Sequence, residues 1–109
     1  MKMKNMELIE HINGLTEMIG EGPNLRVRLS HLINRNYGAL VEAYRPYEED
    51  LRKIDESDAS EDDKNANRME LLSTQIDVPI ANISLAEIEN EPLNLKQMHI
   101  LHFMIGDTE

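Results

Sequence analysis

The residues best equipped for chemistry in this sequence are the carboxylates gathered near its middle. Nine acids and two bases stand between residues 48 and 63. The acids are Glu48, Glu49, Asp50, Asp55, Glu56, Asp58, Glu61, Asp62 and Asp63. Calcium prefers oxygen ligands, but its loop pattern needs a glycine at the sixth position and a glutamate at the twelfth. Counted from Asp58, those positions hold Asp63 and Met69. The spacing therefore argues against a specific calcium site.

The same acids have a second use as a binding surface. Carboxylates displayed on a rigid helix imitate the phosphate backbone of a nucleic acid, whose binding is dominated by its charge. However, residues 55–67 contain no large apolar residue, which predicts a solvated, mobile loop. Many of the acids would then lie off any rigid face. Nucleic-acid mimicry is therefore an alternative to a plain solvated segment.

Histidines are the other residues able to bind a metal. His99 and His102, three residues apart, form the only close pair, and the nearest acids are Glu91 and Asp107. A zinc site needs three or four ligands, and the sequence has no cysteine to supply one. We expect no metal and no cofactor, and interpret the two histidines as the polar edge of a helix.

No arrangement of residues indicates nucleophilic catalysis. Ser30 and His31 are adjacent, but neighbours on a helix do not face each other. The sequence contains no glycine elbow, phosphate loop or dinucleotide fingerprint. We therefore expect a protein that is not an enzyme.

Basic residues form one grouping. It consists of Arg26, Arg28, Arg35 and Arg45. Arg28 and Arg35 are seven residues apart, so they would share a helix face. That face is either simply solvated or a patch that binds acids, including those of a second copy.

Length and composition limit the classes of protein. The chain has 109 residues and no cysteine, which suits one domain, residues 1–109, in a reducing compartment. Residues 1–47 carry six bases and five acids, and residues 48–109 carry five bases and sixteen acids, a net charge of -11. This charge disfavours direct binding to nucleic acid or to anionic membranes. No apolar run resembles a signal peptide or a membrane span, so we expect a cytoplasmic protein.

Two helices are expected in the first half of the chain. Apolar residues at helical spacing predict a helix over about residues 6–19, ended by the Gly20–Pro23 segment. A second helix should begin near Pro23. Its apolar residues recur alternately four and three apart, the rhythm of a coiled-coil seam. They are Ile33, Tyr37, Leu40, Tyr44, Tyr47, Leu51 and Ile54.

Pro46 interrupts this second helix but not its seam. A proline inside a helix removes one hydrogen bond and costs about 3 kcal/mol. We therefore expect one helix kinked at Pro46, or two helices nearly end to end. The seam and its acidic neighbours form the expected partner site, used by another protein or in a homodimer. The residues concerned are Leu40, Tyr44, Tyr47, Leu51, Glu48, Glu49 and Asp50.

The remaining chain predicts shorter elements. Apolar residues alternate over residues 76–80, which indicates a strand, and Pro79 confines it to a sheet edge. Its partner is either a short segment not evident in the sequence, the helices, or another chain. Ser84 begins a capping box, and Asn94 can cap a last helix of about residues 95–105 whose apolar residues predict extensive burial.

The order of these features resembles small, uncharacterised proteins of phages and prophages of Gram-positive bacteria, grouped as domain of unknown function 1617. The resemblance rests on a helix with Ile33-Asn34-Arg35-Asn36, a polar loop, the stretch Ile76-Asp77-Val78-Pro79-Ile80 and the closing Leu101-His102-Phe103-Met104-Ile105. It covers roughly residues 23–106. It implies a phage origin and a non-enzymatic role, and it transfers no site residues.

Together these patterns predict a mainly α fold, in which a long kinked helix packs with N- and C-terminal helices, with at the margin one short edge strand. Two functions fit such a chain. One is a phage-type interaction or assembly protein that works through its helical seam. The alternative is an acidic inhibitor that imitates nucleic acid and blocks a host enzyme in a counter-defence role.

Overall fold

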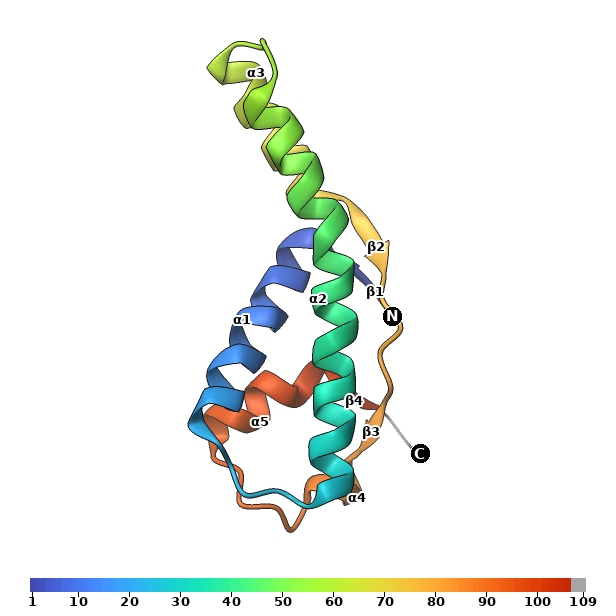
Figure 1. Ribbon diagram of the computed structural model, residues 1–109. Coiled ribbons are helices and arrows are strands. Elements are labelled where there is room, and N and C mark those ends of the chain that lie inside the picture. The colour runs from blue at the N-terminus through green and yellow to red at the C-terminus, as the bar shows by residue number, and fades with distance from the viewer. Residues whose placement is uncertain (107–109) are drawn as a thin grey trace.

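The computed structural model describes residues 1–106 and confirms the mainly α fold. The elements are β1 (Lys2–Lys4), α1 (Asn5–Glu21), α2 (Val27–Glu56), α3 (Glu61–Ser73), β2 (Gln75–Asp77), β3 (Ile83–Ser84), α4 (Leu85–Ile88), α5 (Leu95–Leu101), a 3-10 turn (His102–Met104) and β4 (Ile105–Gly106). Helix α2 is the spine, and α1 lies alongside it while α5 crosses behind (Figure 1).

The first two helices form because their apolar stripes face each other. Leu8 and Leu15 of α1 and Leu40 of α2 are completely buried in the same core cluster. Helix α1 ends at a left-handed residue, Gly22, whose φ of 63° suits glycine. Gly14 lets α5 approach, because an added Cβ would lie 3.3 Å from Ile100. The predicted N-terminal helix is therefore confirmed.

Helix α2 runs unbroken through Pro46 and begins at Val27 rather than near Pro23. The missing hydrogen bond of a proline in mid-helix costs about 3 kcal/mol. Tyr47, the next residue, is 7% exposed and belongs to the buried side of the helix. Packing of this turn against the core offsets part of that cost. Of the two expected arrangements, the structure has one helix rather than two.

The strand predicted over residues 76–80 is confirmed only in part, because β2 ends at Asp77, before Pro79. Its partner lies at the start of the same chain. β2 pairs antiparallel with β1, with Ile76 opposite Met3. The lysines of β1 flank a single apolar residue, so this strand carries no recognisable alternation. A second pair joins β3 to β4 in parallel, with Ile83 opposite Ile105.

Helices occupy most of residues 55–67, so the prediction of a loop there was wrong except at residues 57–60. Asp55 and Glu56 end α2, only residues 57–60 form a turn, and α3 starts at Glu61. Ser60 caps α3, because its Oγ accepts a hydrogen bond of 3.1 Å from the Asp63 N–H. The three acids of its first turn complement the helix dipole. The loop was expected because residues 55–67 have no apolar stripe. The capping and dipole interactions at the start of α3 favour a helix without such a stripe.

The last helix is shorter and more exposed than predicted. Asn94 caps it as expected, since its side chain accepts from the Gln97 N–H at 2.8 Å. Helix α5 ends at Leu101, after which the chain tightens into the 3-10 turn and extends as β4. Leu101 is completely buried but Leu95 is 90% exposed. Residues Ile105 and Gly106 are extended rather than helical because they pair with β3.

One buried polar side chain ties the second half of the chain to the spine. Asn36 of α2 is completely buried. Its Nδ2 donates to the Ala81 carbonyl at 2.9 Å, and its Oδ1 accepts from the Ala81 N–H at 2.8 Å. Both main-chain groups of Ala81 are thus satisfied inside the protein, which holds the segment between β2 and β3 against α2.

Candidate protein-binding site on the helical arm

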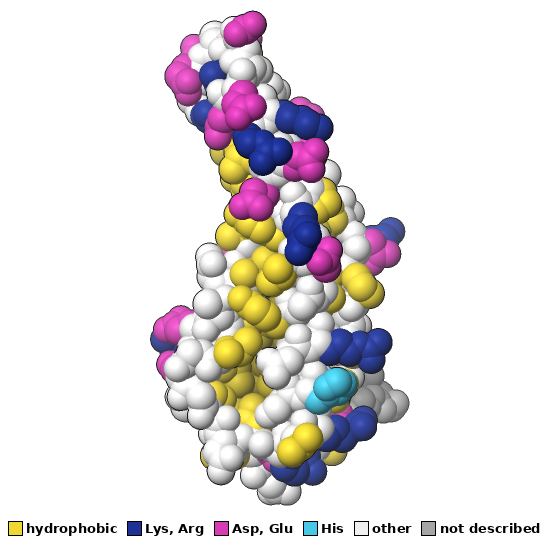
Figure 2. Space-filling model, viewed as in Figure 1, with side chains coloured by type: hydrophobic (Ala, Val, Ile, Leu, Met, Phe, Trp, Pro, Cys, Tyr) yellow, Lys and Arg dark blue, Asp and Glu magenta, His cyan; other side chains and the backbone are white. Residues whose placement is uncertain are grey.

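The most distinctive surface is a helical hairpin that projects from the rest of the molecule (Figure 1). We call residues 48–73 the arm, meaning the end of α2, the turn at 57–60 and α3, and the other described residues the body. The molecule measures 54 × 30 × 21 Å, elongated in keeping with this projection. Acidic and basic side chains crowd the arm, whereas basic side chains gather at the opposite end of the same face (Figure 2).

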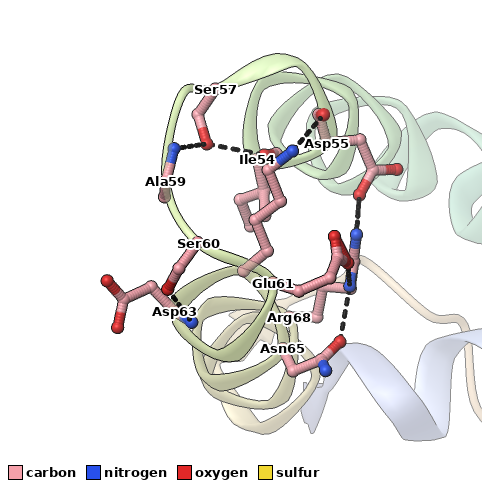
Figure 3. A network of polar contacts seen from close by, with 10 residues as sticks. Ile54, Asp55, Ser57, Ala59, Ser60, Glu61, Asp63, Asn65 and Arg68 are labelled. Carbon is pink, nitrogen blue, oxygen red and sulfur yellow. Dashed lines mark hydrogen bonds and ion pairs between the residues drawn. The ribbon is translucent and has the colours of Figure 1, made fainter.

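Polar contacts hold the two helices of the arm together (Figure 3). Arg68 of α3 donates from Nε and Nη2 to Asp55 Oδ1 of α2, at 2.9 and 2.7 Å. Its Nη1 lies 3.5 Å from Glu61 Oε1. Hydrogen bonding to Asp55 is the main cause that raises the pKa of Arg68. This arginine therefore holds α3 against α2. It also compensates the charge of Asp55 within the fold.

Side-chain hydrogen bonds to main-chain carbonyls close the turn of the arm. Ser57 Oγ donates to the Ile54 carbonyl at 2.8 Å (Figure 3). Lys64 Nζ donates to the Asp55 carbonyl at 3.0 Å. These bonds satisfy carbonyls that a helix C-terminus leaves without intrahelical donors. The arm is thus a helical hairpin with a closed turn rather than a solvated loop.

The structure divides the predicted partner site in two. Leu40 is 0% exposed and Tyr47 is 7% exposed, so both belong to the protein's own core. Burial, then Tyr44 and Asp55, raise the pKa of Tyr47. Tyr44 and Leu51 are half-buried, and only the acidic members of the site are exposed. These are Glu48, Glu49 and Asp50.

Both sequence features that predicted a homodimer are accounted for inside one chain. The seam packs largely against the chain's own helices, and β2 pairs with β1. A homodimer therefore stays a prediction, and neither the seam nor the strand supports it.

A small cavity lies at the root of the arm, where α2 and α3 join the body. Its volume is about 240 Å³. Its lining residues are Asn5, Ala43, Pro46, Tyr47, Asp50, Leu71, Thr74, Ile76 and Asp77. The sequence did not reveal this site, because the lining comes from three separate stretches of the chain. No local pattern brings Asn5 to Leu71, and the polar residues concerned carry no motif.

The histidines gather at a different place. His11, His99 and His102 line a cavity of about 360 Å³ together with Glu10 and Phe103. The His11 ring stacks on Phe103 with centroids 3.8 Å apart. Burial lowers the pKa of His11, against the opposing effect of Glu7 and Glu10. Within residues 1–106 no group of three potential ligands is arranged to hold a metal ion.

Two of the four arginines in the basic grouping form ion pairs within the chain. Arg26 Nε lies 2.8 Å from Glu91 Oε2, and Arg28 Nε lies 2.6 Å from Glu87 Oε1. The hydrogen bond from Arg28 is the first cause that lowers the pKa of Glu87. These arginines hold α2 to the α4 region, so they are poorly placed to attract acids of a second copy.

The adjacent Ser30 and His31 both lie on α2. Ser30 is half-buried and His31 is exposed.

Searches for similar proteins add no further assignment. No family model, curated protein or solved structure matches this chain. The resemblance to the phage family therefore stays a prediction. Among the described helices, none combines the length and the apolar character that crossing a bilayer requires.

Proposed function

We propose that this chain is a non-enzymatic protein of phage type that binds another protein through its arm, in assembly or in regulation. The observation that carries the proposal is the display of Glu48, Glu49 and Asp50 on a helix that projects from the body. A projecting hairpin reaches into a groove that a flat surface does not enter. Its charge favours a partner with a basic surface.

Folding alone does not explain the acids at the end of α2. The C-terminus of a helix carries partial negative charge, so stability favours cations in its last turn. Here the last turn holds Lys53 but also Asp55 and Glu56. Asp55 is compensated by Arg68, whereas Glu56 is exposed at an end where it is unfavourable. Acids at such positions support a role in binding.

Capture from a bacterial lysate tests this proposal when matched variants are compared. The arm variant carries Glu48→Gln, Glu49→Gln and Asp50→Asn. The control carries Glu10→Gln, Glu42→Gln and Glu89→Gln, which change the net charge equally outside the arm. We expect proteins that the parent and the control capture but the arm variant loses, with mass spectrometry as the readout. Identical capture by all three proteins would contradict the proposal.

A second candidate is an inhibitor that imitates nucleic acid. Of the nine acids between residues 48 and 63, five lie in α2 and three in α3, and only Asp58 lies in the turn. A helical display favours mimicry more than a loop would. This candidate predicts that the captured protein binds DNA, that duplex DNA competes with the chain, and that binding falls steeply as salt rises. Simultaneous binding of DNA and the chain would rule it out.

A further inference from the structure

The cavity at the root of the arm contains an acceptor that lacks a donor. Asn5 is 3% exposed. Its Nδ2 donates to the Leu71 carbonyl at 2.9 Å, and its main-chain N–H donates to the Thr74 carbonyl at 3.0 Å. These bonds orient the side-chain amide. Its Oδ1 is the buried side-chain polar atom that has no partner within the described residues.

Such an atom is costly, which points to a ligand. A buried acceptor without a hydrogen bond has lost its bonds to water and gained none in return. Leu71 and Thr74, the two residues that bind Asn5, also line the cavity. Asn5 is therefore held by two other residues of the cavity wall. A donor that reaches this wall would give Asn5 Oδ1 its missing bond.

The mouth of the cavity is negative. Asp50 of α2 is exposed and lines it together with Asp77 of β2. Asp77 already accepts from the Met1 amino group at 2.9 Å, and that bond is the first cause that lowers its pKa. Asp50 therefore supplies the main charge for a ligand. The lining found within residues 1–106 includes no lysine or arginine.

The remaining walls are apolar, and the size suits one side chain. Ala43, Pro46, Leu71 and Ile76 present carbon atoms, and Tyr47 adds an aromatic ring. A volume of about 240 Å³ is below the roughly 300–1,000 Å³ that is usual for small-molecule sites. Methylene groups would pack on these walls, and a guanidinium stacks on aromatic rings.

We propose that this cavity binds the guanidinium of an arginine side chain supplied by the protein partner. A guanidinium carries five donors in a planar fork, whereas an ammonium is a compact, strongly hydrated charge. The several donors of the guanidinium match the two acceptors that the lining residues Asn5 and Asp50 carry, an amide oxygen and a carboxylate. The assignment of the arginine to a partner rests on the proposed function. Recognition of the guanidinium does not.

Titration of the isolated, nitrogen-15-labelled chain tests recognition directly. The probe is N-acetyl-arginine amide, and the comparator is N-acetyl-citrulline amide, which has nearly the same shape without the charge. We expect saturable NMR shifts at Asn5, Thr74 and Ile76, including the Asn5 side-chain amide. Because charge-assisted bonds are the stronger ones, we expect the comparator to bind at least about tenfold more weakly. Equal binding of both compounds would overturn the proposal.

Matched variants locate the site. Asp50→Asn should weaken binding of the arginine probe at least about fivefold, because it removes the charged partner of the guanidinium. Glu42→Gln makes the same change of charge about two turns earlier on α2, outside both the lining and the arm, and should leave binding nearly unchanged. Ala43→Leu should abolish binding by filling the cavity. Equal weakening of probe binding by Asp50→Asn and Glu42→Gln would show attraction by the general field and would contradict the proposal.

Competition then identifies the source of the arginine. The arginine probe should release a protein captured through the arm, and the citrulline probe should not. If the probe binds the cavity but releases nothing, the site serves a free guanidinium compound and the partner assignment is wrong. If no protein is captured through the arm, the proposed function fails and the partner assignment with it, while the NMR result still decides recognition of the guanidinium.

Discussion

The body and the arm are stabilised by different interactions, although α2 runs through both. The body buries apolar side chains completely, among them Leu15, Leu40 and Leu101. In the arm, α3 buries none of its side chains within the described structure, and Arg68 joins it to Asp55. Burial of apolar surface is the dominant favourable term in folding, whereas exposed ion pairs contribute little.

Because of this difference, residues of the body are constrained by folding, whereas the charged residues of the arm are free to serve binding. Most surface charges of the arm can change without exposing a core, so their identity is free to suit a partner. Body residues such as Leu40 lack this freedom. The comparison therefore predicts that substitutions in the body act on stability and substitutions in the arm act on binding.

Placing a charge at Leu40 should have the largest effect. Leu40→Asp buries an unpaired carboxylate in a core position that is 0% exposed, and we expect a loss of at least about 4 kcal/mol. That is a large part of the ~5–15 kcal/mol that stabilises a typical domain. Leu51→Asp, on the same seam but half-buried in the arm, should cost much less. Urea unfolding followed by circular dichroism would measure both, and equal losses would contradict the division.

The polar anchor in the body should come next. Asn36→Leu removes both bonds to Ala81, and each main-chain group left buried without a partner costs roughly 1–3 kcal/mol. The control is Asn34→Leu, since Asn34 is an exposed asparagine of the same helix. A shift of the urea midpoint for Asn36→Leu alone is the expected result. If the two variants unfold alike, water or a neighbour must replace the lost bonds.

The sequence predicted best those parts that are set by local signals. The apolar spacing identified α1 and α2, and Ser84 and Asn94 identified helix starts that the structure confirms. Such signals act within a few residues, through one helix face or one capped turn. They need no knowledge of which segments meet.

The features that the sequence did not reveal depend on contacts between distant segments. β1 becomes a strand because it pairs with β2, more than 70 residues later. Helix α3 has no apolar stripe, and Arg68 holds it to Asp55. The candidate cavity joins Asn5 to Asp50 and Asp77. Which seam residues face the core likewise depends on the helices that cover them. Single-sequence patterns carry none of this information.

His11 is a half-buried titratable side chain at the edge of the body. Its lowered pKa means that the folded state binds its proton more weakly than the unfolded state does, for which the ordinary value is 6.5. The contribution of His11 to stability is therefore present above about pH 6.5 and is lost as the pH falls below it. The urea midpoint of the parent should decrease between pH 7.5 and pH 5.5. The midpoint of His11→Gln should decrease less over the same interval. An NMR titration midpoint at or above 6.5 would refute this.

The smallest effect on global stability is expected in the arm. Arg68→Met keeps the methylene groups but removes the bonds to Asp55 and the ion pair with Glu61. Because these contacts join only α2 and α3, hydrogen exchange should accelerate in α3 while the amides of Leu15 and Leu101 keep their protection. Arg52→Met, at an exposed arginine of the arm, is the control and should leave α3 unchanged. Faster exchange throughout the body after Arg68→Met would mean that arm and body open as one cooperative unit. Substitutions in the arm that suit a partner would then also change the stability of the body.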